Sequence, residues 1–147
     1  MQTLDAGQRD PGTYRFAFTG IDAEGTWHWR VSAVDDLGRE SSVDQPFTYD
    51  LTLSGLSVPV SAAPATGLTA RFRLSRAASV ALTIETPRGV VVASPPAQEE
   101  PAGTASLAWD GTLSTGAKAP PGSYLARVTA TSDVGTSDLA ASFAIRG

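Results

Sequence analysis

An internal repeat limits the fold of this chain more than any other feature of its sequence. Residues 25–33 (GTWHWRVSA) align with residues 122–130 (GSYLARVTA), and at the same offset of 97 residues Asp36-Leu-Gly38 aligns with Asp133-Val-Gly135. Residues 12–20 align with residues 103–111, and residues 47–49 align with residues 143–145. Because a repeat marks the structural unit of a chain, we expect two copies of one unit.

Both copies have the hydrophobic pattern of β-strands. Apolar and polar residues alternate along the repeated segments, with no helical period of 3.6 residues. The 14 glycines and 10 prolines of the 147 residues separate these short runs, as turns do in a sheet protein. Each copy therefore predicts a strand, a loop, a second strand, a tight glycine turn and a third strand, in an all-β chain.

The second copy is preceded by further strands. Residues 67–76 place Leu68, Ala70, Phe72 and Leu74 on one face, and residues 78–86 alternate in the same way. Pro87-Arg88-Gly89 predicts a turn into a third run at residues 90–92. The proline-rich residues 94–103 predict a loop that joins no ladder. Residues 51–147 thus contain about seven short strands, which predicts a complete β-sandwich of the immunoglobulin-like or fibronectin-III-like kind.

The first copy is predicted to be a partial unit at residues 1–50, with its last three strands and a boundary near Asp50. Its strands carry Val31 and five aromatic side chains, which at about 150 Å² each would expose about 750 Å², more than monomers usually tolerate. We expect this face to be covered by strands of a parent chain, by a protein partner or identical subunit, or by the second unit. The interface residues are predicted to be Tyr14, Phe16, Phe18, Trp27 and Trp29.

A motif in the second copy is predicted to hold the sandwich together. Trp109 fills the core, Asp110 accepts backbone N–H groups in a turn, and Gly111 allows the positive φ of that turn. The complete motif consists of Trp109, Asp110, Gly111, Gly116, Pro121, Gly122 and Tyr124.

This motif resembles the immunoglobulin-like domain of the flagellar hook-capping protein, which also occurs as repeats in secreted and surface-attached bacterial proteins. The resemblance covers residues 51–147 and is strongest over residues 103–131. It implies a noncatalytic module that spaces, attaches or caps, with no active-site residue, and an extracellular or cell-surface location.

Composition excludes several classes of function. With no cysteine, the chain has no disulfide, thiol nucleophile or thiolate metal site. A net charge of -4 and a pI near 4.8 argue against nucleic-acid binding. No apolar run reaches the roughly 18 residues of a membrane span, and Met1-Gln2-Thr3 does not open a signal peptide.

The polar residues predict no catalytic or metal site. His28 is the single histidine, which excludes a multi-histidine zinc site. Any serine triad would have to use this same residue. Because Trp27 and Trp29 flank it in a strand, His28 should point away from both of them. The acidic candidates for calcium, which are predicted to be turn residues instead, are Asp22 with Glu24, Asp35 with Asp36, and Asp110.

We therefore predict no enzyme activity, cofactor or metal. The predicted function is that of a structural, adhesive or assembly module. The alternative is a carbohydrate-binding module that uses Trp27, Trp29 or other exposed aromatic side chains.

Overall fold

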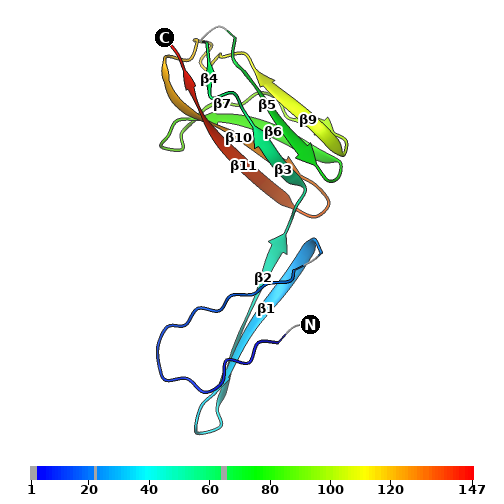
Figure 1. The fold of residues 1–147 in the computed structure, drawn as a ribbon, viewed down its shortest axis with the longest axis vertical. Helices are drawn as coiled ribbons and strands as arrows, with labels where there is room; N and C mark the ends of the chain where they lie inside the picture. The colour runs from blue at the N-terminus through cyan, green and yellow to red at the C-terminus, as the bar shows by residue number, and fades with distance from the viewer. Residues whose placement is uncertain (1–2, 22, 64–65) are drawn as a thin grey trace.

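The computed structural model describes residues 3–21, 23–63 and 66–147, and its regular structure over these residues consists of β-strands (Figure 1). The strands form three sheets: two make up a sandwich, and the third is a separate two-stranded hairpin. The all-β prediction is confirmed. In the described part of the chain, no helix has the length and apolar character that a membrane crossing requires.

The sandwich has a larger and a smaller sheet. The larger sheet consists of β4 (Ser61–Ala62), β6 (Ala78–Glu85), β7 (Val91–Ala93), β8 (Gln98–Glu100), β10 (Gly122–Thr131) and β11 (Thr136–Ile145), and the smaller of β3 (Leu53–Ser57), β5 (Leu68–Leu74) and β9 (Gly103–Trp109). The strand order is β4-β11-β10-β6-β7 in the larger sheet, with β8 also paired to β6, and β3-β5-β9 in the smaller. All pairs are antiparallel except β11 with β4.

The core lies between these two sheets. Side chains alternate between buried and exposed along β5, and the inward positions of β6 and β10 are also buried, as the period of two predicts. Trp109 packs edge-on against Phe143 with ring centroids 6.1 Å apart, and Tyr124 stacks on the same ring at 5.8 Å. The first hydrophobic residue of the core is Leu53, so residues 3–21 and 23–52 contribute none.

One loop prediction is wrong. Residues 98–100, predicted to lie in a loop without a ladder, form β8 and pair with Ala78–Val80 of β6. The three prolines at 95, 96 and 101 flank this short strand and none lies within it, so its N–H groups remain available. The sandwich consequently has more strands than the sequence predicts, and the additional ones are two or three residues long.

The hairpin repeats the last two strands of the sandwich. In the hairpin, β1 (Gly25–Val34) pairs with β2 (Glu40–Tyr49) so that Trp27 lies opposite Phe47. In the sandwich, β10 pairs with β11 over equally many residues, and Tyr124 lies opposite Phe143. The repeat in the sequence is therefore a repeat of one hairpin, in the same register.

The third strand predicted for residues 1–50 is not formed. The aligned residues of the sandwich, 103–109, form β9 because β5 offers an edge for pairing. The described residues of the first copy include no strand equivalent to β5, and a lone extended segment has no ladder to join. The division into a partial unit at 1–50 and a complete unit at 51–147 stays a prediction.

The hairpin lies at one end of the sandwich (Figure 1), and polar contacts join the two parts. Glu24, just before β1, forms an ion pair with Arg76 of the β5–β6 turn, and Arg76 also lies 3.2 Å from Asp133. The backbone N–H of Leu51 donates to the Glu24 carboxylate at 2.6 Å. The connection therefore depends on charged groups and leaves the apolar side chains of the hairpin outside the core.

Candidate functional site

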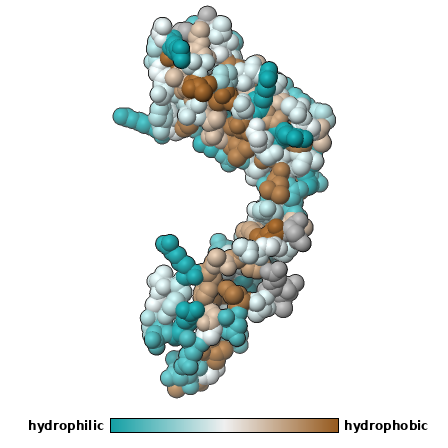
Figure 2. All heavy atoms as spheres, in the orientation of Figure 1, coloured by the Kyte–Doolittle hydropathy of each residue, from teal (hydrophilic) through white to brown (hydrophobic). Residues whose placement is uncertain are grey.

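One face of the hairpin is apolar and exposed. Alternation along β1 and the register with β2 place six large apolar side chains on this face, beside Ala33, Ser41 and Gln45: Trp27, Trp29, Val31, Val43, Phe47 and Tyr49. Trp29 is 42% exposed and Val31 is 49% exposed. Figure 2 shows apolar residues at the surface of the lower, hairpin part of the molecule. We call this surface the aromatic face.

The equivalent face of the second hairpin is buried. Trp29 and Val31 correspond to Ala126 and Val128 of β10, and both of these are 0% exposed. The difference has a structural cause: β10 pairs with β6 on its other side, and its inner face packs against the smaller sheet. In the described residues, no strand occupies either place at β1.

The predicted interface residues lie in two places. Trp27 and Trp29 share the aromatic face, and Trp27 is half-buried with its indole N–H donating to the Ala23 carbonyl at 3.0 Å. The other three, which are all exposed, lie on the irregular segment before the hairpin: Tyr14, Phe16 and Phe18.

The segment that carries these three residues is held by local contacts. The Tyr14 hydroxyl donates to the Asp10 carbonyl, and the Arg9 guanidinium lies 5.3 Å from the centre of the Tyr14 ring. The sequence prediction omitted Val43, Phe47 and Tyr49 from the interface. The alignment of residues 47–49 with 143–145 was the signal that could have found the last two.

The opposite face of the hairpin is polar. His28 Nδ1 lies 2.9 Å from Asp44 Oδ1, and Arg30 Nε donates to Asp44 Oδ2 at 3.1 Å. The hydrogen bond from His28, together with the Arg30 guanidinium, holds the pKa of Asp44 below its ordinary value. His28 is exposed and points away from Trp27 and Trp29, as predicted.

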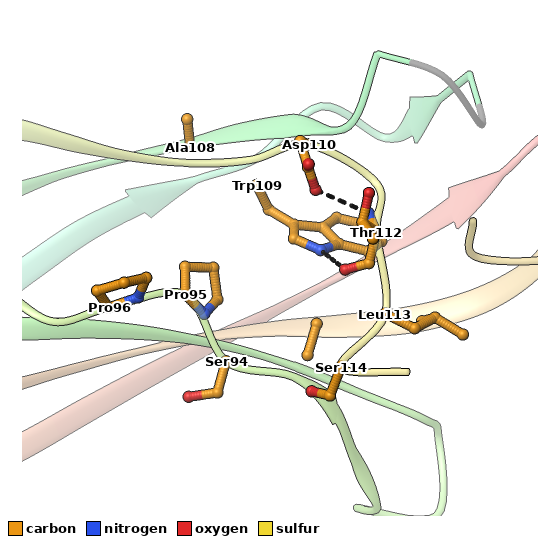
Figure 3. Close-up of a pocket in the computed structure, with 10 residues that line it drawn as sticks. Ser94, Pro95, Pro96, Ala108, Trp109, Asp110, Thr112, Leu113 and Ser114 are labelled. Atoms are coloured by element: carbon orange, nitrogen blue, oxygen red, sulfur yellow. Dashed lines mark hydrogen bonds between the residues drawn. The ribbon is translucent and has the colours of Figure 1, made fainter. Parts of the chain in front are cut away.

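The motif residues lie at one end of the sandwich. The buried Trp109 donates its indole N–H to the Thr112 carbonyl at 2.8 Å, and Asp110 Oδ1 accepts the Thr112 N–H at 2.8 Å (Figure 3). Gly111 has a φ of +81°, which favours glycine. These contacts close the turn after β9.

The rest of the motif follows in the next segment. The Tyr124 hydroxyl donates to the Pro120 carbonyl at 2.9 Å, and Gly122 is the first residue of β10. Pro121 directly precedes β10. Gly116 closes a turn, in which its backbone N–H donates to the Leu113 carbonyl at 2.9 Å. Together with the turn after β9, these contacts link the ends of β9 and β10, and the structural role of the motif stays a prediction.

A shallow cleft of about 350 Å³ lies beside this turn (Figure 3). Its lining includes Pro95, Pro96, Leu113 and one titratable side chain, Asp110, which is already engaged by Thr112. The cleft therefore brings together no pair of groups for acid–base or nucleophilic chemistry.

We predict that Asp110 gives the sandwich part of its stability in acid. The hydrogen bond from the Thr112 N–H holds the pKa of Asp110 below its ordinary value of 3.8. Because the folded pKa is the lower one, this contribution is complete above about pH 4 and is lost as the pH falls through the folded pKa. Asp110→Asn keeps an accepting oxygen but does not titrate. Urea unfolding at a series of pH values should show a shallower acid loss for the variant; identical slopes would contradict the prediction.

Three of the acidic residues considered for calcium, Glu24, Asp35 and Asp110, have other partners. Asp35 accepts the N–H groups of Leu37 and Arg39 and pairs with the Arg39 guanidinium at 2.6 Å, while Glu24 pairs with Arg76. Asp22 lies outside the described residues. Among residues 3–21, 23–63 and 66–147, no three metal-binding side chains come together.

The comparison with family models agrees with the sandwich. The model of the FlgD Ig-like domain matches residues 60–133, half of the chain, which include all of β4 to β10. Among solved structures, the chain is similar to dimeric latent PorU from Porphyromonas gingivalis, with 20% identity and a TM-score of 0.46 over 84% of this chain and 12% of that chain. No curated protein matches the chain.

Proposed function

Because the chain belongs to the FlgD Ig-like domain family, we propose that it is a noncatalytic structural, adhesive or assembly module of a bacterial surface or secreted protein. In this proposal the hairpin β1–β2 is half of a second immunoglobulin-like unit, which strands of a partner or parent chain complete. Its working surface is the aromatic face, and its location is extracellular or at the cell surface.

The observation that carries the proposal is the contrast between the two hairpins. They share register and length, yet Val128 is 0% exposed and the equivalent Val31 is 49% exposed. Burial of apolar surface stabilises by about 25 cal/mol per Å². Covering the exposed half of several aromatic side chains would therefore contribute on the order of 10 kcal/mol before entropic costs.

The sandwich indicates what kind of strand fits. Strand β6 pairs antiparallel with β10 and places Val80, Leu82 and Ile84 beside Ala130, Val128 and Ala126. On β1 the equivalent neighbours are Ala33, Val31 and Trp29. A strand with apolar residues at alternate positions would extend the sheet by main-chain hydrogen bonds and cover part of the aromatic face.

A peptide with the β6 sequence, ASVALTIE, tests the proposal. We expect saturable binding with a blue shift of tryptophan emission, because Trp29 becomes less exposed. Val31→Asp should weaken binding at least about tenfold, since it places a charge against the added strand. Leu37→Asp is the matched control, because Leu37 is exposed in the turn between β1 and β2, and should have no effect.

Two outcomes would overturn the proposal. One is the absence of saturable peptide binding, at any soluble peptide concentration, to protein diluted until it sediments as a single chain. The other is an emission change with soluble polysaccharides and none with the peptide, which would identify the aromatic face as a carbohydrate-binding surface.

A further inference from the structure

We propose that the strand beside β1 comes from a second copy of this chain. Two β1 strands would pair antiparallel across a two-fold axis at Val31, giving a continuous sheet in the order β2-β1-β1-β2. This inference rests on the proposed function, since it specifies the partner that completes the hairpin.

The backbone shows which edge of the hairpin is open. The Asp35 N–H donates to the Arg39 carbonyl at 3.0 Å, so odd-numbered residues of β1 exchange hydrogen bonds with β2. The even-numbered residues, from Thr26 to Val34, direct their N–H and C=O groups to the other edge. That edge has no strand partner among the described residues.

The two edges of the hairpin differ. On β2 the even-numbered residues also point outward, and one of them is Pro46, which has no N–H group to donate. A proline on an edge strand opposes further pairing there. The outward positions of β1 contain no proline, so β1 is the edge that can accept a neighbour.

The second hairpin sets the register. Strand β10 pairs with β6 over Leu125–Thr131, and the equivalent stretch of β1 is residues 28–34, whose midpoint is Val31. Two identical strands that pair antiparallel are related by a two-fold axis at one point of the strand. With that axis at Val31, all of residues 28–34 pair with the same residues of the second copy.

The side chains of β1 are compatible with an axis at Val31. Trp29 would lie opposite Ala33 of the second copy, a large side chain beside a small one, and Arg30 would lie opposite Ser32 of the second copy. An axis at Arg30 would place two guanidinium groups opposite each other, which destabilises a sheet. The sequence of β1 is therefore self-complementary in this register.

The segment before the hairpin provides a second layer. Tyr14, Phe16 and Phe18 align with Ala105, Leu107 and Trp109, the inward residues of β9. In a dimer, two copies of residues 12–18 would pair with each other and cover the extended sheet as the smaller sheet covers β10 and β11. Together with the aromatic face, each copy offers on the order of 500 Å², so the dimer reaches the roughly 1,000 Å² of a specific interface.

Disulfide formation tests the axis, because the chain has no cysteine of its own. Residue 31 would form a non-hydrogen-bonded pair with its symmetry mate, with Cα atoms about 4.5 Å apart, within the range of a disulfide. Val31→Cys should form a covalent dimer under mild oxidation. Val43→Cys is the matched control: it lies on the same face, but its symmetry mate is three strand spacings away, about 14 Å. We expect crosslinking at least about tenfold slower for the control.

Sedimentation of the unmodified chain gives the second readout. The expected mass at tens of micromolar is twice the 15.2 kDa of one chain. Equal crosslinking of both variants, or a mass of one chain, overturns the inference. A single-chain mass with binding of the β6 peptide overturns the second copy as partner and leaves the proposed function standing, whereas failure of both experiments rejects both proposals.

Discussion

Replacing Trp109 with alanine is expected to lower the free energy of unfolding of the sandwich by about 4 kcal/mol. Trp109 is 4% exposed, packs edge-on against Phe143 and donates its indole N–H to the Thr112 carbonyl. The substitution leaves a cavity at the core and an unpaired carbonyl at the turn. Because the net stability of a domain is about 5–15 kcal/mol, this loss is a large part of the whole.

Urea unfolding followed by circular dichroism measures this effect, and Trp29→Ala is the matched control. The same atoms are removed from the exposed aromatic face, so the expected change in the unfolding of the sandwich is below about 0.5 kcal/mol. Similar losses for the two variants would contradict the separation of hairpin and core.

The substitution Gly67→Ala is expected to destabilise the sandwich by at least about 3 kcal/mol. Gly67 has a φ of +62°, and a Cβ atom there would lie 1.7 Å from the Trp109 carbonyl oxygen. The next residue, Leu68, pairs with Trp109, so the backbones of the two segments lie side by side here. The added Cβ atom would collide with a backbone atom, and no side chain can move aside to make room. Either the β5–β9 ladder shifts at this end or the turn before β5 opens.

A second glycine separates strain from collision. Gly55 has a φ of +63°, and a Cβ atom there would meet nothing within 4 Å. Gly55→Ala should therefore cost only the backbone strain, about 1 kcal/mol. In thermal unfolding, the Tm of Gly67→Ala should be well below the Tm of Gly55→Ala. Equal Tm values would show that the close approach of Gly67 to the Trp109 backbone has no energetic consequence.

Local patterns predicted the parts of the fold that depend on alternation. Residues 68–74 bury every second side chain as expected, and Pro87-Arg88-Gly89 forms a turn, in which the Gly89 N–H donates to the Thr86 carbonyl at 2.9 Å. These features follow from period and turn chemistry within a few residues. Prediction failed where a strand depends on a distant edge, as at residues 12–20 and at β8.

The candidate site was predicted in part for the same reason. Trp27 and Trp29 belong to one alternating run and could be assigned to one face from the sequence. Val43 and Phe47 join them only through the register of β1 with β2. The open edge of β1 depends on which residues exchange hydrogen bonds with β2, and this is a property of the folded hairpin.

The amino-acid sequence by itself determined that the chain is all-β, that one hairpin occurs twice, and that the first copy carries an aromatic face. Each of these follows from spacing along the chain, because side-chain direction in a strand alternates with a period of two. The tertiary structure alone decided which face is buried, that Gly67 touches the backbone of β9, and that the buried Glu85 meets Arg127 of β10 at 2.8 Å. These depend on atoms far apart in sequence, whose proximity is set by how the sheets pair and pack.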